Sequence, residues 1–190
     1  MTTSVIRELK RQWRYRIDSN RLLTMKIFII AVLTADGLIA EGTDQISTDW
    51  TSKEDKKFFS TRTKEAGVIV LGYNTYKTIG RPLPGRLNIV YANPDTVIEG
   101  AEVTQLAPAD LIKDLEERGY KEVAICGGST TYTMFMEAGL VDKLYITIEP
   151  VVFGAGMTLF NKKFDVKKLK LVFMQKLGEE TVLLEYDVKR

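Results

Sequence analysis

Short apolar runs rich in β-branched residues alternate along the chain with segments whose apolar positions recur at helical spacing. The apolar runs predict eight strands, at residues 26–33, 68–71, 87–91, 102–104, 122–126, 143–148, 169–176 and 181–188. The helical spacing predicts four helices, at residues 52–63, 75–79, 108–117 and 130–137. Such an alternation is typical of α/β proteins with a mostly parallel sheet.

The last two predicted strands differ from the others because no helix separates them. Only the polar stretch 177–180 lies between them. Parallel strands need a long crossover connection, whereas a short connection joins antiparallel strands. We therefore predict an antiparallel hairpin at the C-terminal end of an otherwise largely parallel sheet.

Residues 1–24 differ in composition from the rest of the chain. Six basic residues there stand against Glu8 and Asp18, which gives this segment a net charge of +4 and leaves −2 for the remainder. Its apolar residues recur at every fourth position, namely Val5, Leu9, Trp13 and Ile17. This spacing predicts a basic helix with one apolar face, separate from a domain at 25–190.

Three interpretations of this segment stay open. The helix could pack on the main domain or on a second subunit, it could contact an acidic surface, or it could be an extension before a start at Met25. The first interpretation allows either a monomer or a homodimer in which the segment takes part in self-association.

The composition narrows the classes of protein. With 45% hydrophobic and 27% charged residues and a net charge of +2, the chain is expected to fold as a globular domain. Its longest apolar runs, 27–33 and 68–71, are far shorter than the roughly 20 residues that cross a bilayer, so we expect no membrane span. The single cysteine, Cys126, cannot close an intrachain disulfide, which favours a reducing, cytoplasmic setting.

The chain contains no histidine. This excludes the usual Cys/His zinc sites and catalysis by Ser-His-Asp or Cys-His arrangements, and we expect no metal centre. Any proton transfer must then use carboxylates, tyrosine, lysine or water.

Asp55 is the first candidate for chemistry. The segment 51–55 predicts a capping box, with Thr51 as the N-cap and Glu54 reaching back to it. Asp55 lies one position further and shares a helix face with Phe59 and Thr63. It could be an ordinary first-turn acid favoured by the helix dipole, or a carboxylate at the end of a partly apolar stripe that faces a site.

Several motifs place the chain beside a known family. The run GYNTYKTIGRPLPGRLNIV at 72–90 resembles the signature stretch of dihydrofolate reductases. Trp50 before Asp55, the diglycine Gly127-Gly128 after a predicted strand, and the late strand segment 144–147 match the same family in the same order. The resemblance covers 25–190 and implies a single-domain, three-layer fold whose central eight-stranded sheet carries helices on both faces.

The resemblance implies reduction of 7,8-dihydrofolate to 5,6,7,8-tetrahydrofolate by hydride transfer from NADPH, with the proton reaching N5 through water. Asp55 would bind N3 and the 2-amino group of the pterin, because two parallel donors match a carboxylate. Thr147 would share this hydrogen-bond network. Trp50 would hold an ordered water and the preceding loop 40–49, which corresponds to the family's active-site lid.

The resemblance also implies a substrate pocket. Arg86 would clamp the α-carboxylate of the glutamate tail of folate. The full set of implied substrate-binding residues is Ile30, Ala31, Val32, Lys56, Phe59, Ile79, Leu83, Arg86, Cys126 and Tyr132.

The cofactor would be held without a G-x-G-x-x-G fingerprint, which the chain lacks. Two helix N-termini, at 72–75 and 127–130, offer backbone N–H groups to its phosphates, and in the family the diglycine peptide is cis. Tyr73 stands where the family commonly has a basic residue, so NADH is not excluded. The implied cofactor-binding residues are Ala31, Ile39, Gly72, Tyr73, Asn74, Thr75, Ala92, Asn93, Cys126, Gly127, Gly128, Ser129, Thr130 and Thr131.

Two other functions fit parts of the sequence. The segment 34–40 also resembles the related reductase domain of riboflavin biosynthesis, which acts on 5-amino-6-(5-phosphoribosylamino)uracil, and Lys56 could bind its phosphate. A nucleic-acid-binding module that uses the basic segment is the third hypothesis. It is disfavoured as the main function because the chain lacks an aromatic-basic RNA-binding motif.

Overall fold

The computed structural model describes residues 25–189. The predicted basic helix, with Val5, Leu9, Trp13 and Ile17, lies outside the described residues. The described elements, in chain order, are β1 (Lys26–Thr34), β2 (Leu38–Ala40), the 3-10 helix η1 (Ser47–Asp49), α2 (Lys53–Ala66), β3 (Val68–Gly72), α3 (Tyr73–Ile79), β4 (Leu87–Tyr91), β5 (Glu102–Thr104), α4 (Pro108–Glu117), β6 (Glu122–Ile125), α5 (Ser129–Glu137), β7 (Lys143–Glu149), β8 (Met157–Thr158), β9 (Leu169–Leu177) and β10 (Thr181–Val188).

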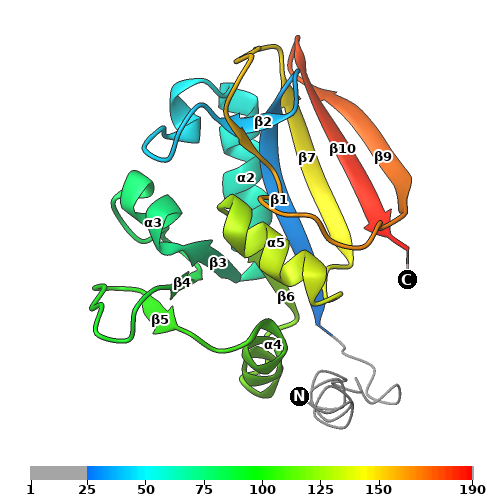
Figure 1. The fold of residues 1–190 in the computed structure, drawn as a ribbon. Coiled ribbons are helices and arrows are strands. Elements are labelled where there is room, and N and C mark those ends of the chain that lie inside the picture. The colour runs from blue at the N-terminus through cyan, green and yellow to red at the C-terminus, as the bar shows by residue number, and fades with distance from the viewer. Residues whose placement is uncertain (1–24, 190) are drawn as a thin grey trace, which may run out of the picture.

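All eight predicted strands join one sheet, in the order β5-β4-β3-β6-β1-β7-β10-β9. The pairs from β5 to β7 are parallel. Strand β10 is antiparallel to both β7 and β9. The predicted C-terminal hairpin is therefore confirmed, and it extends the sheet at one edge (Figure 1).

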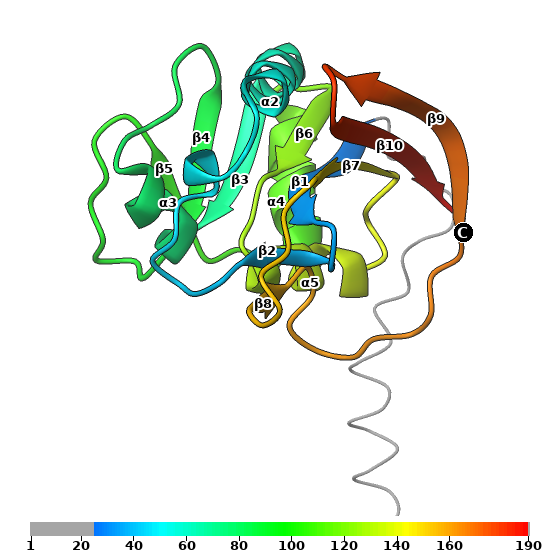
Figure 2. The same ribbon diagram turned by 90° about the horizontal axis from the view of Figure 1, so that it is seen from above.

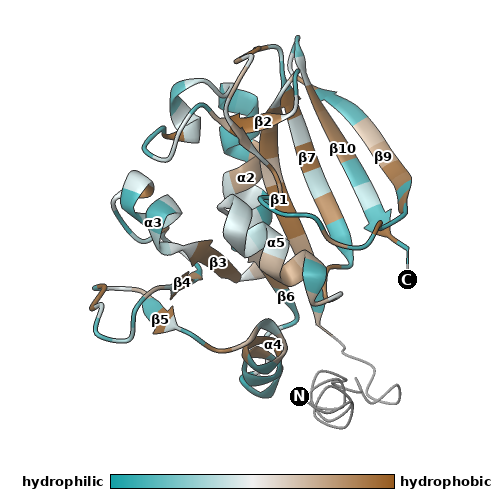
Figure 3. Cartoon of the chain, in the orientation of Figure 1, coloured by the Kyte–Doolittle hydropathy of each residue, from teal (hydrophilic) through white to brown (hydrophobic). Residues whose placement is uncertain are grey.

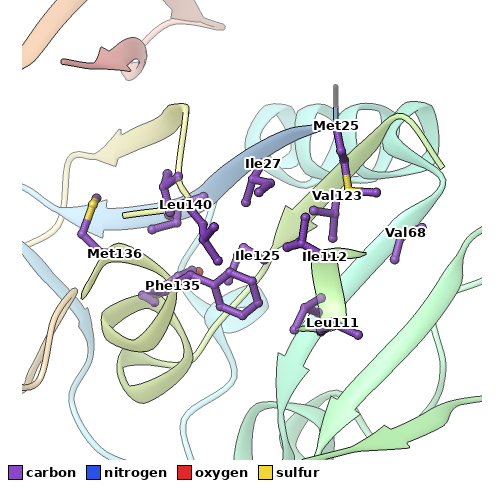
Figure 4. Packing of buried hydrophobic residues seen from close by; sticks show 14 of the residues in the cluster. Met25, Ile27, Val68, Leu111, Ile112, Val123, Ile125, Phe135, Met136 and Leu140 are labelled. Carbon is purple, nitrogen blue, oxygen red and sulfur yellow. The ribbon is translucent and has the colours of Figure 1, made fainter. Parts of the chain in front are cut away.

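Helices cover both faces of the sheet, as Figure 2 shows from above. One buried cluster packs α4 and α5 on the sheet, with Ile112 and Phe135 both 0% exposed (Figure 4). A second cluster packs Phe58 and Phe59 of α2 against the opposite face. The hydrophobic residues concentrate on the central strands β1 and β3 (Figure 3). The predicted three-layer α/β fold is confirmed.

The strand order places the site. Strand β1 lies between β6 and β7, with β3 beyond β6, and these strands run parallel. Their carboxyl ends therefore lie side by side, at the same end of the parallel strands. Ligands of open α/β sheets bind in crevices at such ends, because neighbouring connections diverge there to opposite faces.

Three features differ from the sequence predictions. Strands β2 and β8 form a separate two-stranded sheet that was not predicted. Within the predicted loop 40–49, residues Ser47–Asp49 form a 3-10 helix. The prediction of Thr51 as N-cap of α2 is wrong, because the cap is Ser52, whose Oγ accepts a hydrogen bond from Asp55 N at 3.1 Å.

None of the described helices is long and apolar enough to span a membrane. Over the same part of the chain, no group of three or more Asp, Glu, Cys or His side chains is arranged to hold a metal ion.

Candidate active site

A cavity of about 740 Å³ opens at the carboxyl ends of the central strands. Its wall includes every apolar residue predicted to line the pocket, namely Ile30, Ala31, Val32, Ile39, Phe59, Ile79, Leu83 and Cys126. The charged residues on this wall are Asp55 and Lys56, both in the first turn of α2. The rest of the wall is neutral, so a ligand meets one carboxylate and one ammonium group in apolar surroundings.

Asp55 is buried, with only 8% of its surface exposed. Burial raises its pKa to about 6, and the negative charge of Glu149 acts in the same direction. Hydrogen bonds from Thr147 and Thr51 and the positive charge of Lys56 partly offset this shift. Asp55 therefore changes charge close to neutral pH, which is unusual for an aspartate and common at functional sites.

Thr147 and Trp50, both predicted to be catalytic, do not line the cavity themselves. Thr147 is 1% exposed and bonds to Asp55 from β7, the neighbouring strand of β1. The Trp50 ring meets Phe153 edge-on with 5.2 Å between ring centroids. Its Nε1 is buried and has no hydrogen-bond partner among the described residues.

Tyr132 and Cys126 lie on the wall and stay neutral. The Tyr132 hydroxyl donates to the carbonyl oxygen of Ile30 at 2.9 Å. Burial raises the pKa of both the Tyr132 hydroxyl and the Cys126 thiol. Asp55 is therefore the group on this wall whose titration reaches the physiological range.

Glycines build a narrow cradle at one end of the cavity. The peptide between Gly127 and Gly128 is cis, as predicted, and Gly72 N donates to the carbonyl oxygen of Gly127 at 2.7 Å. A Cβ on Gly72 would lie 2.9 Å from Thr131 Oγ1, and one on Gly128 would lie 3.1 Å from Thr75 Oγ1. Only glycine therefore fits these close contacts, and the glycines line the cavity with backbone atoms alone where α5 begins. First-turn N–H groups of a helix favour an anion.

The predicted cofactor-binding residues fall into two groups. Twelve of them lie on the wall of the main cavity: Ala31, Ile39, Gly72, Tyr73, Asn74, Thr75, Cys126, Gly127, Gly128, Ser129, Thr130 and Thr131. Ala92 and Asn93 line a second cavity of about 530 Å³, to which Tyr73 also contributes. Tyr73 and Tyr91 lie on both walls, so the two cavities adjoin.

Charge is sparse in the second cavity. No charged side chain of the described residues lies on its wall. Lys77 packs over the Tyr73 ring, with Nζ 5.3 Å from the ring centroid. Lys77 is therefore placed beside the wall, one helical turn after Tyr73.

Lys56 and Arg86, both predicted to bind substrate, are placed differently. Lys56 lies on the wall of the main cavity, whereas Arg86 does not. The guanidinium of Arg86 donates to Thr63 Oγ1 and to the carbonyl oxygen of Pro84. Tyr132, the remaining predicted substrate residue, lies on the wall.

Sequence reasoning missed several residues of the site. From the predicted lid the wall takes Ala40, Gly42, Thr43, Gln45, Ile46, Ser47 and Thr48, and from elsewhere Thr51, Thr78, Tyr91, Met134, Met157 and Asn161. It also missed Glu149, which acts on the charge of Asp55 from β7. The signal was available, because Thr147 and Glu149 alternate with apolar residues and so share one face of the strand.

The comparisons with known proteins agree with this geometry. A family model described as dihydrofolate reductase matches residues 26–187. Dihydrofolate reductase type 3 of Salmonella typhimurium is 36% identical over 126 residues, which make up 65% of this chain and 71% of that protein.

Two solved structures share the fold. A putative riboflavin biosynthesis protein from Shewanella sp. PV-4 has a TM-score of 0.76 at 21% identity, covering 87% of this chain and 100% of that one. Dihydrofolate reductase from Enterococcus faecalis, complexed with NADP(H), has a TM-score of 0.70 at 24% identity, covering 87% and 97%. The arrangement of sheet and helices is common to all three chains.

Proposed function

The chain belongs to the dihydrofolate reductase family, and we propose that it reduces 7,8-dihydrofolate to 5,6,7,8-tetrahydrofolate with NADPH as the hydride donor. The observation that carries the proposal is Asp55, a buried carboxylate on the wall of an otherwise largely apolar cavity. The cavity continues into the glycine cradle. The same cavity can therefore hold the pterin ring of the substrate beside Asp55 and the phosphates of the cofactor in the cradle.

Asp55 binds and orients the substrate in this proposal. The N3–H and 2-amino group of a pterin present two parallel donors, which a carboxylate accepts in bidentate fashion. Thr147 fixes the carboxylate from the strand behind it. Because the site is apolar, these charge-assisted hydrogen bonds are stronger than in water, and the negative charge pushes electron density of the ring away from the bound edge, toward N5. Water supplies the proton to N5.

The residues of the cradle fit a dinucleotide. Gly72 and Gly128 lie on the cavity wall, where an added Cβ would press on the hydroxyl of Thr131 or Thr75, and α5 begins at this point with its first N–H groups. Ser129, Thr130 and Thr131 add hydroxyl groups on the same wall. When bound, the nicotinamide supplies the hydride, and the protein contributes proximity, orientation and exclusion of water.

Turnover tests the proposal directly. The purified chain should oxidise NADPH only when dihydrofolate is present, and Asp55→Asn should lose most of this activity while it still folds. Arg86→Leu should weaken dihydrofolate binding and leave cofactor affinity nearly unchanged, as expected for a residue that contacts the glutamate tail. Deletion of residues 1–24 should leave turnover intact, because we assign the reductase domain to 25–190.

A second candidate function is favoured by one observation. Lys56 lies on the wall beside Asp55, whereas Arg86 is engaged by Thr63 and Pro84 and is not on the wall. An ammonium group there can bind a phosphate as a point charge. We therefore keep 5-amino-6-(5-phosphoribosylamino)uracil as the alternative substrate. Turnover of this compound without turnover of dihydrofolate, abolished by Lys56→Gln, would replace the first proposal.

A further inference from the structure

Glu149 is a buried carboxylate that the proposed reaction does not use. It ends β7 and is only 3% exposed. Its Oε1 accepts from Ser52 N at 2.9 Å and from Ser52 Oγ at 2.7 Å, and its Oε2 accepts from Thr181 Oγ1 at 2.8 Å. A charge taken out of water is costly unless it is paired or hydrogen-bonded, and here three donors satisfy it.

The direction of each hydrogen bond explains why the acceptor is a carboxylate. Ser52 and Thr181 each have one hydroxyl hydrogen. The Ser52 hydroxyl donates to Glu149, and the Thr181 hydroxyl lies within donating distance of both Glu149 Oε2, at 2.8 Å, and Ser52 Oγ, at 3.1 Å. Ser52 Oγ remains free to accept from Asp55 N, which it does at 3.1 Å as the N-cap of α2. The chain of bonds therefore runs from Asp55 through Ser52 to Glu149 and on to Thr181.

This network joins three elements at the point where Asp55 enters the site. Ser52 precedes α2, Glu149 ends β7 and Thr181 begins β10. Thr147, two residues before Glu149, lies on the same face of β7 and bonds to the Asp55 side chain. One strand thus holds both the backbone of the first turn of α2 and the carboxylate that this turn carries.

We propose that Glu149 is a positioning residue, which anchors the first turn of α2 to β7 and β10 and thereby fixes Asp55 in the cavity beside Thr147. The inference deepens the proposed function and rests on it for the claim that Asp55 binds substrate. The hydrogen bonds themselves do not depend on the identity of that substrate.

Glu149 also acts on Asp55 through its charge. The titratable groups that act on Asp55 are Lys56 of α2, Glu149 of β7 and Tyr132 of α5, and burial keeps Tyr132 neutral. The negative charge of Glu149 raises the pKa of Asp55 and Lys56 lowers it. Loss of the Glu149 charge alone should therefore lower the pKa of Asp55.

Two substitutions at Glu149 separate shape from charge. In Glu149→Gln the amide oxygen still accepts from Ser52, and the amide nitrogen donates to Thr181 Oγ1, whose hydrogen can turn to Ser52 Oγ, 3.1 Å away. The anchor is thus kept without its charge. In Glu149→Ala both the anchor and the charge are lost. The matched control is Glu185→Gln. Glu185 lies on β10 and pairs with Lys143, so this variant removes an acid elsewhere on the same strand pair.

Two readouts test the proposal. The first is the titration of Asp55 in the protein without ligands, followed by carbon NMR of labelled aspartate and assigned with Asp55→Asn. We expect a lower pKa of Asp55 in Glu149→Gln and no change in Glu185→Gln. The second is turnover of dihydrofolate, where Glu149→Ala should lower kcat/KM on the order of 10²-fold, since small misplacements at a site have effects of this size. Glu149→Gln should keep most of the kcat/KM of the unaltered protein, because it keeps the anchor.

The outcomes are distinct. Wild-type kcat/KM in a folded Glu149→Ala would overturn the proposal, and wild-type titration of Asp55 in Glu149→Gln would overturn the claim that Glu149 also acts on Asp55 through its charge. If Glu149→Ala does not fold, Thr181→Val, which keeps the charge and removes one anchoring donor, replaces it, and wild-type kcat/KM there would be equally contrary. Failure of the proposed function would appear instead as absence of dihydrofolate turnover in the unaltered protein, with the NMR result unaffected.

Discussion

Replacement of Asp55 by asparagine should stabilise the protein at neutral pH while it removes activity. Burial raises the pKa of Asp55 from 3.8 to about 6. An acid with a higher pKa in the native state than in the unfolded state binds more protons when native between those two values. The free energy of unfolding therefore falls as the pH rises from about 4 to about 6. A shift of about two units corresponds to about 3 kcal/mol, which ionised Asp55 costs the native state above pH 6.

Asparagine removes this cost because it is neutral at every pH and nearly isosteric. Its side-chain oxygen can still accept from Thr147, but its amide N–H groups need partners that the carboxylate did not, which offsets part of the gain. We expect Asp55→Asn to raise the free energy of unfolding by about 1 to 3 kcal/mol at pH 8. At pH 4 most of the gain should vanish, because Asp55 is then protonated in the native state and roughly 40% protonated in the unfolded state.

Urea unfolding followed by tryptophan fluorescence measures both values. The control is Glu54→Gln, which removes the same charge from the neighbouring position of α2, where the side chain is exposed. It should change the free energy of unfolding by less than about 0.5 kcal/mol at either pH. Equal or lower stability of Asp55→Asn at pH 8, or the same gain at pH 4 and pH 8, would refute the assignment of Asp55 as a strained, buried acid.

Three further substitutions test other parts of the account. Gly72→Ala places a Cβ 2.9 Å from Thr131 Oγ1, so NADP⁺ should bind roughly tenfold more weakly by calorimetry; unchanged affinity would argue against the cradle. Lys77→Gln should lower kcat/KM for NADPH roughly three- to tenfold and spare NADH, because the lysine beside Tyr73 is the cation placed to meet a 2′-phosphate; an equal loss with both cofactors would contradict this. Phe135→Ala leaves a cavity at a fully buried position and should reduce the free energy of unfolding by about 3 to 5 kcal/mol. A loss below about 1 kcal/mol would show that the core is not tightly packed there.

The sheet was predictable because its strands carry strong local signals. Val68–Gly72 is a continuous apolar run, and Leu87–Tyr91 is apolar except for the buried Asn88, as expected of strands covered on both faces. The hairpin of β9 and β10 followed from the short polar connection alone. In contrast, Leu38–Ala40 and Met157–Thr158 are too short to show a periodicity, and they pair only because distant loops meet.

The details of the site depend on contacts that sequence patterns do not contain. Thr51 and Ser52 are both favoured N-cap residues. Ser52 becomes the N-cap because Glu149, 97 positions further along the chain, accepts hydrogen bonds from it. Glu149 in turn needs Thr181, 32 positions further on. Asp55 was identified through the family resemblance, but its raised pKa depends on burial and on the charge of Glu149, which only the folded chain brings together.

The central claim is that Asp55 binds the pterin ring of dihydrofolate in a reductase. The most direct test is the initial rate of NADPH oxidation by the purified protein with dihydrofolate, measured beside Asp55→Asn, with NADH as the second donor. The account predicts substrate-dependent oxidation that Asp55→Asn reduces by at least about a hundredfold. Undiminished turnover in Asp55→Asn, or no turnover by a folded protein that binds NADPH, would contradict it.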